Sequence, residues 1–368
     1  MTYNWEQEDW PNFQYDLSGL EGYLLQFAEN QGRIMSSVDA LPKGMKEVSI
    51  LDIMVAEALK TSAIEGEFLS REDVLSSIRN TLGLNRYPEK IKDKRAEGMA
   101  KLMVVVREEF EQELSEELLF EWHQMMMEPY THIQVGQWRT GEEPMQIISG
   151  AVDKVIIHFE APPSTRVPSE MKQFIQWFNE TAPGRSKSFV YAPVRSAIAH
   201  LYFESIHPFE DGNGRIGRAL SEKVLSQSLG RPALVSFSNV VEPKRQAYYE
   251  ALKTAQRATD ITPWIQYFLE TMISAQNWTI EQLRFSIKKT QFFDKYKGQL
   301  NLRQEKVLNR MFEAGPAGFE GGMRTKKYMA ITKTSKATAT RDLQELVKME
   351  ALTTKGGGRS TRYDLDLP

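Results

Sequence analysis

The stretch from His207 to Arg218 constrains this chain more than any other part of it, and its sequence is His-Pro-Phe-Glu-Asp-Gly-Asn-Gly-Arg-Ile-Gly-Arg. It combines an imidazole, a carboxylate, a glycine-flanked turn and two guanidinium groups, a mixture that few core segments need. The glycines on either side of Asn213 let the backbone turn tightly and expose successive N–H groups to an anion. The residues that follow begin a helix whose positive end faces the same spot. The stretch therefore predicts a phosphate-binding turn at the start of a helix.

The side chains of this stretch fit the same chemistry. Arg215 and Arg218 lie three residues apart at the predicted helix start, and guanidinium groups suit bidentate contacts with neighbouring phosphate oxygens. Asp211 provides the hard oxygen ligand that a magnesium ion bridging phosphates requires. Histidine titrates close to neutral pH, so His207 is the candidate general base. A structural turn with a capping Asp and a solvated Arg pair would explain any three of these residues, but not all of them together.

The stretch resembles the His-Pro-Phe-x-x-Gly-Asn-Gly-Arg-x-x-Arg signature of the Fic family of protein adenylyltransferases, and it matches that signature at every fixed position. The resemblance implies an enzyme that binds ATP with magnesium and transfers AMP to a Ser, Thr or Tyr hydroxyl of a protein, releasing pyrophosphate. It implies that His207 is the catalytic base and that Asp211 positions the magnesium ion. The implied nucleotide-binding residues are Gly212, Asn213, Gly214, Arg215, Ile216, Gly217 and Arg218, with Glu65 and Tyr249 outside the signature.

A second motif lies far upstream. Apolar residues recur at three- and four-residue spacing from Val48 to Ile64, which predicts an amphipathic helix that stops at Gly66. It ends in Thr-Ser-Ala-Ile-Glu-Gly, and taken alone the Glu would be an ordinary solvated residue. Beside the Fic signature, this hexapeptide is similar to the family's inhibitory motif, Ser/Thr-x-x-x-Glu-Gly/Asn. The resemblance implies that Glu65 pairs with Arg218 and occupies the guanidinium group meant for the γ-phosphate, so that ATP binds only in a non-productive pose.

Two short β-rich runs, residues 145–150 and 154–159, predict a hairpin. Fic proteins carry a hairpin flap here that clamps an extended target segment by strand addition, which an exposed strand edge allows. The resemblance implies that the target-binding residues of this flap are Val155, Ile156, Ile157 and His158. The alternative is a structural hairpin that covers the helical bundle.

The segment from Arg245 to Gln256 resembles the family's downstream helix, whose tyrosine region borders the adenine. Stacking of Tyr249 on a base is chemically reasonable. Ordinary helix packing explains the tyrosines of this segment almost equally well, so both interpretations stay open.

The C-terminal residues, from about 302 onward, differ from the rest of the chain in their predicted elements and in their charge. Helices are predicted at 302–314, 323–330 and 335–349, followed by two short strands around a glycine-rich tip, an order typical of a winged helix-turn-helix. Residues 323–368 contain ten Lys or Arg against five Asp or Glu, a net charge of +5. The basic residues on or beside the third helix and in the wing are Lys333, Lys336, Arg341, Lys348, Arg359 and Arg362. This pattern allows DNA binding, but winged helices also serve as dimerisation or protein-docking modules.

The predicted fold class is mainly α: a Fic-type helical bundle with a short β-hairpin flap, plus a C-terminal winged helix-turn-helix domain. The predicted divisions are an N-terminal helical region at 1–95 with the inhibitory helix at about 48–66, a Fic catalytic core at 96–275, and a linker helix with the winged-helix domain at 276–368. Within the first region, Ser70 and Asp73 have the spacing of a helix N-cap.

The amino-acid composition limits which binding partners we expect for this protein. The chain has no cysteine, which excludes disulfides and thiolate metal sites. Its net charge of −3 argues against a protein whose entire surface binds nucleic acid or another polyanion. No long apolar run and no basic leader are present, so we expect a cytoplasmic protein without a membrane partner. The expected partners are ATP and a protein target, with self-modification, a homodimer and DNA as further candidates.

Other functions remain open at this point. In relatives the same motif supports transfer of phosphate or phosphocholine, or removal of AMP from a protein. A different class is a transcription regulator in which the Fic core senses a nucleotide and the C-terminal domain binds DNA.

Overall fold

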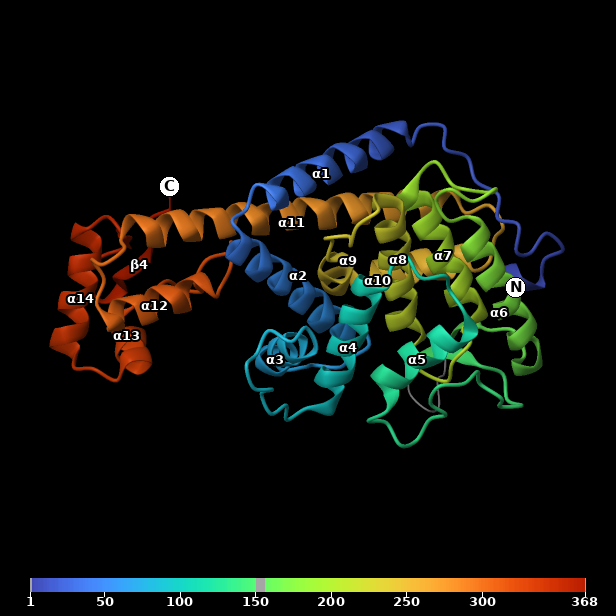
Figure 1. The fold of residues 1–368 in the computed structure, drawn as a ribbon, viewed down its shortest axis with the longest axis horizontal. Helices are drawn as coiled ribbons and strands as arrows, with labels where there is room; N and C mark the ends of the chain where they lie inside the picture. Colours follow the sequence, from blue (N-terminus) through green and yellow to red (C-terminus); the bar gives the residue numbers. More distant parts are fainter. Residues whose placement is uncertain (1, 150–155, 368) are drawn as a thin grey trace. The chain divides into compact units, whose positions relative to one another are not determined.

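The computed structural model describes residues 2–149 and 156–367 (Figure 1). It divides into two compact units: unit 1 comprises Met1–Arg33 and Ile50–Thr279, and unit 2 comprises Ile34–Ser49 and Ile280–Pro368. Three long helices contribute residues to both units, namely α1 (Glu21–Asp39), α2 (Lys43–Ile64) and α11 (Thr262–Lys295). The structure is mainly helical, as predicted. None of the helices among the described residues is long and apolar enough to span a membrane.

Unit 1 is a bundle of helices with one small sheet. Its remaining helices are α3 (Arg71–Thr81), α4 (Lys94–Glu108), α5 (Glu116–Met127), α6 (Val167–Glu180), α7 (Ala192–Ile206), α8 (Asn213–Leu229), α9 (Phe237–Val241) and α10 (Arg245–Ala255), with short 3₁₀ turns at Asn4–Glu6, Ser164–Arg166 and Glu242–Lys244. Strands β1 (Gln146–Ser149) and β2 (Ile156–Glu160) pair antiparallel, with Ile147 opposite Phe159. The predicted hairpin is thus confirmed, although Val155 lies outside the described residues.

Local sequence signals explain several helix boundaries. The Ser70 side chain accepts a hydrogen bond from the Asp73 backbone N–H at the start of α3, which confirms the predicted cap, and Ser115 caps α5 in the same way. Helix α2 begins at Lys43, five residues before the predicted start at Val48, and it ends at Ile64. Gly66 follows with a φ of +82°, a left-handed conformation that favours glycine and stops the helix.

The core of unit 1 is centred on α7, in which every residue from Pro193 to Ile206 is buried. A helix that is buried on all sides occupies the middle of a bundle. Phe209, just beyond the end of α7, is fully buried and lies among Phe203, Trp138 and His123. The loop that follows α7 is therefore anchored to the core by its own side chain.

This anchoring leads to a prediction about stability. Truncating a buried Phe to Ala leaves a cavity and costs about 3–5 kcal/mol. We expect Phe209→Ala to lower the free energy of unfolding by that amount, measured by urea denaturation. Leu302→Ala, at a side chain that is 85% exposed, is the control and should change it by less than about 0.5 kcal/mol. Equal effects of the two substitutions would contradict the anchoring role.

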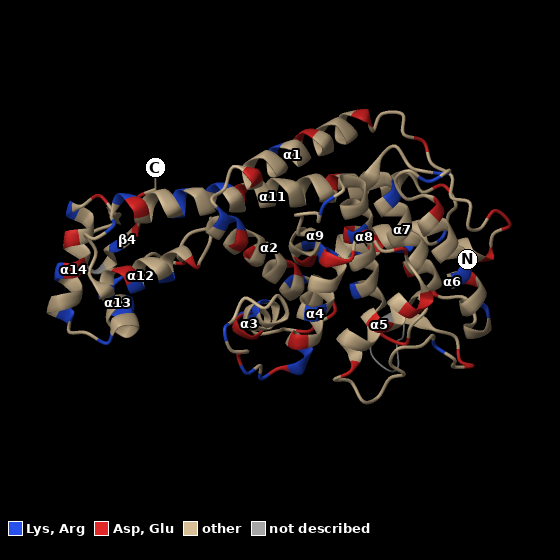
Figure 2. Cartoon of the chain, in the orientation of Figure 1, with Lys and Arg blue, Asp and Glu red and all other residues tan. Residues whose placement is uncertain are grey.

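Unit 2 has its own core. Helices α12 (Leu302–Phe312), α13 (Thr325–Thr332) and α14 (Lys336–Lys348) are followed by strands β3 (Leu352–Lys355) and β4 (Arg362–Leu365), which pair antiparallel, and Met323 forms a further bridge with Tyr363. Phe292 and Tyr296 of α11 join this core. Figure 2 shows basic residues along α12, α13 and α14.

Candidate functional site

The signature residues form a tight turn between α7 and α8. His207 ends α7 with a φ of +49°, and Gly212 precedes α8 with a φ of +83°. A left-handed His is held only if its surroundings fix it, and here the buried Arg139 does so. Its Nε donates to the His207 carbonyl oxygen at 2.8 Å, and its backbone N–H donates to the Pro208 carbonyl at 2.9 Å.

The Asn213 side chain ties the turn to itself. Its Oδ1 accepts from the Phe209 backbone N–H at 2.9 Å, and its Nδ2 donates to the Phe209 carbonyl at 2.8 Å. The side chain is fully buried, so it shapes the loop and is not directed at a ligand. The first N–H groups of a helix have no intrahelical acceptor, so those at the start of α8 can donate to an anion.

The His207 imidazole is nearly buried, with 11% of its side chain exposed, and Glu204 Oε2 lies 3.6 Å from its Nδ1. Glu204 is buried on α7, one turn earlier. Burial raises the pKa of Glu204, but the neighbouring His207, with His200 and Arg218, outweighs that effect and holds the pKa below its usual value. A carboxylate in this place favours a proton on Nδ1 and leaves Nε2 as the basic nitrogen.

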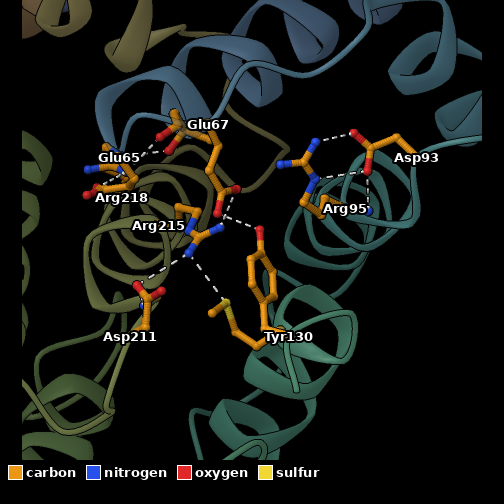
Figure 3. Close-up of polar contacts among 11 residues, drawn as sticks. Glu65, Glu67, Asp93, Arg95, Tyr130, Asp211, Arg215 and Arg218 are labelled. Carbon is orange, nitrogen blue, oxygen red and sulfur yellow. Dashed lines mark hydrogen bonds and ion pairs between the residues drawn. The ribbon is translucent and has the colours of Figure 1, made fainter. Parts of the chain in front are cut away.

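Arg218 is held by residues of the 61–66 segment at the end of α2 (Figure 3). Its Nη2 donates to Glu65 Oε1 at 2.7 Å and to the Thr61 carbonyl at 3.0 Å, and its Nε donates to Thr61 Oγ1 at 2.7 Å. The arginine side chain is 1% exposed. Burial alone lowers the pKa of Arg218, but the negative charge of Glu65 outweighs it and the pKa lies above the ordinary arginine value. Glu65 also lies against Gly214, where any side chain would collide with its carboxylate.

Arg215 has partners of its own. Its Nη1 lies 2.9 Å from Glu67 Oε2, and its Nη2 lies 3.5 Å from Asp211 Oδ1 and 3.4 Å from the Met127 sulfur. Asp211 is half exposed and also accepts from the Gly212 backbone N–H. Among the described residues, no group of three or more His, Asp or Glu side chains is arranged to hold a metal by itself. A single open carboxylate suits an ion that takes most of its ligands from phosphate and water.

The comparison with known families matches two segments of this chain. Residues 113–225, which contain the turn, match the family described as Fic/DOC family, and residues 3–84 match one described as a domain of unknown function (DUF4172). Residues 113–225 form a Fic domain. The boundaries place α5, α6, α7 and most of α8 in the Fic domain, and the Glu65 segment in the other match.

Relatives and solved structures agree with this assignment. A probable protein adenylyltransferase of Aquifex aeolicus is 33% identical over 98 residues, which cover 27% of each chain. The protein adenylyltransferase Fic of Nematostella vectensis is 28% identical over 31% of this chain and 25% of its own. The chain thus spans about a quarter of the length of these relatives. A Fic family protein from Desulfovibrio desulfuricans shares the fold, with a TM-score of 0.56 and 20% identity over 96% of this chain and 98% of its own.

The remaining predicted site residues lie in two places. The Tyr249 hydroxyl donates to the Ile64 carbonyl at 3.2 Å, so this tyrosine borders the Glu65 turn, and its side chain is partly exposed. In the hairpin, Ile157 is 42% exposed and the His158 carbonyl accepts from Arg257 at 3.2 Å. Ile156 begins β2, and Val155 lies outside the described residues. Ile216 and Gly217 face inward, and Gly217 leaves the room that Glu204 and His200 occupy.

Glu204 and His123 are two of the residues of the Fic domain whose contacts were not predicted from the sequence. Glu204 lies three residues before His207, a spacing that places both on one helix face and could have revealed the contact. His123 is the other: it stacks on Phe209 with ring centroids 4.1 Å apart, accepts from the Gly136 N–H, and donates from Nε2 to the Asp211 carbonyl at 3.1 Å. Burial lowers its pKa to about 4, so it is a neutral group that fixes the turn.

Proposed function

We propose that this protein is a protein adenylyltransferase that transfers AMP from ATP to a Ser, Thr or Tyr hydroxyl of a protein, and that Glu65 holds it inactive. The observation that carries the proposal is the turn itself: His207 stands beside a helix N-terminus that carries two buried arginines. The names of the relatives support the same chemistry.

In the proposed reaction, His207 Nε2 accepts the proton of the target hydroxyl, whose oxygen attacks the α-phosphorus of ATP. The bond from that phosphorus to the bridging oxygen breaks, and pyrophosphate leaves. The N–H groups at the start of α8, with Arg215 and Arg218, stabilise the charge that grows on the phosphate oxygens. Asp211 would hold magnesium, which when bound neutralises charge on the phosphates. Tyr249 would border the adenine, and the β1–β2 hairpin would hold the target segment.

The inhibited state follows from the contacts of Glu65. Its carboxylate pairs with Arg218 and lies against Gly214, so a negative charge stands where we place the γ-phosphate. A triphosphate in its productive pose must displace this charge, because the γ-phosphate and the Glu65 carboxylate would repel each other and compete for the same guanidinium donor.

The test is the fate of ATP on the Glu65→Gly variant incubated with magnesium. The proposal expects release of pyrophosphate and a gain in protein mass of one AMP group. A gain of one phosphate would mean kinase-like chemistry, and loss of AMP from a previously modified target would mean the reverse reaction. If this variant formed no AMP adduct and released no pyrophosphate, the proposal would be contradicted.

A second function is favoured by unit 2. The order of α12, α13, α14 and the β3–β4 hairpin suits a winged helix, in which the third helix reads DNA. Lys336, Arg341 and Lys348 are exposed on α14, and Lys333 is exposed just before it. We propose that this surface contacts the phosphate backbone of DNA.

We expect the double variant Lys336→Glu/Arg341→Glu to weaken binding to duplex DNA and to reduce the slope of log affinity against log salt by about 2, because each phosphate contact contributes about 1. Fluorescence anisotropy at several salt concentrations measures both. Lys244→Glu, an exposed change in unit 1, is the matched control. Binding that is absent from the wild type, or equally affected by the control, would leave unit 2 as a protein-docking or dimerisation module.

A further inference from the structure

Arg215, like Arg218, is buried and paired with a glutamate. Arg215 has 3% of its side chain exposed, and Glu67 places a carboxylate oxygen 2.9 Å from its Nη1 (Figure 3). The Glu67 side chain is itself 17% exposed, so the pair is screened by water much less than a surface pair. Both guanidinium groups that would hold the polyphosphate therefore face a carboxylate.

The two carboxylates come from one short turn at the end of α2. The N–H groups of Glu65 and Glu67 both donate to the Ser62 carbonyl, at 3.1 and 3.0 Å. Gly66 between them has a φ of +82°, which lets both side chains reach the same helix, α8. Because one hydrogen-bonded turn fixes both residues, a movement of this turn shifts both carboxylates together.

Tyr130 fixes the position of Glu67. Its hydroxyl donates to Glu67 Oε1, and the Arg215 guanidinium lies 5.8 Å from its ring centroid. The nearby Arg95 does not compete for Glu67, because its guanidinium is bound to Asp93 through two hydrogen bonds of 3.0 and 2.7 Å. Glu67 thus has one acceptor oxygen for Tyr130 and the other for Arg215.

We propose that Glu67 is a second inhibitory carboxylate, which holds Arg215 while Glu65 holds Arg218, so that a nucleotide must displace both. The proposal rests on the proposed function for the role of the arginines as phosphate ligands. It also assigns a function to residues 3–84, which match the domain of unknown function: this segment contains both Glu65 and Glu67 and would inhibit the Fic domain.

A contrary role for Glu67 is conceivable on the same contacts. If Glu67 oriented Arg215 for catalysis, as carboxylates often orient arginines, its removal would weaken ATP binding and slow the reaction. The two roles therefore predict opposite signs, and one set of variants separates them.

The experiment measures the dissociation constant for ATP with magnesium by calorimetry, in proteins that all carry His207→Ala so that no transfer occurs. Four are compared: the parent, Glu65→Gly, Glu67→Gln and the double variant. We expect Glu67→Gln to tighten ATP binding about tenfold in the Glu65→Gly background, where one arginine is already released, and less in the parent. Glu121→Gln, an exposed change on α5, is the matched control and should leave the constant unchanged.

Tyr130→Phe is the second variant, because it frees Glu67 without changing charge, and it should shift affinity in the same direction by a smaller factor. Unchanged or weaker ATP binding in both Glu67→Gln and Tyr130→Phe would overturn the proposal. Binding does not require AMP transfer. Tighter ATP binding in these His207→Ala proteins, together with no AMP transfer by the Glu65→Gly variant that retains His207, would therefore contradict the proposed function and leave this proposal standing.

Discussion

Replacing His207 with Ala is expected to reduce AMP transfer by about 10²–10⁴-fold, the usual contribution of a positioned general base. The side chain lies at the end of α7 with Nδ1 facing Glu204, which leaves Nε2 for the target hydroxyl. ATP affinity should change little, because the proposed phosphate ligands are the N–H groups of α8 and the arginines. Initial rates with labelled ATP measure the first quantity, and calorimetry measures the second.

His132→Ala is the matched control for this prediction, because His132 is exposed and outside the signature. Both variants should unfold at the temperature of the wild type. An unchanged transfer rate in His207→Ala would remove this residue as the base. Loss of ATP binding together with loss of transfer would instead assign it to nucleotide binding.

Releasing Arg218 is expected to have the second large effect, in the opposite direction. Glu65→Gly removes the carboxylate that pairs with Arg218 at 2.7 Å, and a charge-assisted hydrogen bond of this kind is worth about 1.5–3 kcal/mol. A barrier lowered by that amount raises the rate about 10- to 160-fold. Initial rates of AMP incorporation give the ratio to the wild type.

Glu65→Gln tests whether the effect depends on charge, since glutamine keeps the length of the side chain and a hydrogen-bond acceptor. We expect it to be activated less than Glu65→Gly and more than the control Glu121→Gln. Incorporation by Glu65→Gly at or below the wild-type level would show that Glu65 does not inhibit the protein.

The parts of the fold that follow from local sequence were predictable. The Ser70 cap, the stop at Gly66 and the turn around Gly212 each depend on residues within a few positions of one another, and the structure confirms the helix boundaries they predict. The pair between Glu65 and Arg218 joins residues 153 positions apart, and only the family resemblance pointed to it. The early start of α2 was missed because residues 43–47 carry no apolar repeat.

The rest of the site depends on long-range packing. The contact of Glu67 with Arg215 spans 148 positions, and that of His123 with the Asp211 carbonyl spans 88; no spacing rule relates residues so far apart. Asn213 and Gly217 show a different limit. Their place in the signature suggested ligand contacts. In the structure the Asn213 side chain is hydrogen-bonded to the loop backbone, and Gly217, which lacks a side chain, leaves space for the Glu204 carboxylate.

The central claim is adenylyl transfer by His207 under restraint by Glu65, and one labelling experiment tests it most directly. Wild type, Glu65→Gly and His207→Ala are incubated with magnesium and with ATP labelled at either the α- or the γ-phosphate, and label on the protein is counted. The account predicts label from the α position alone, strongest in Glu65→Gly and absent in His207→Ala. Label from the γ position, or equal α label in all three proteins, would contradict it.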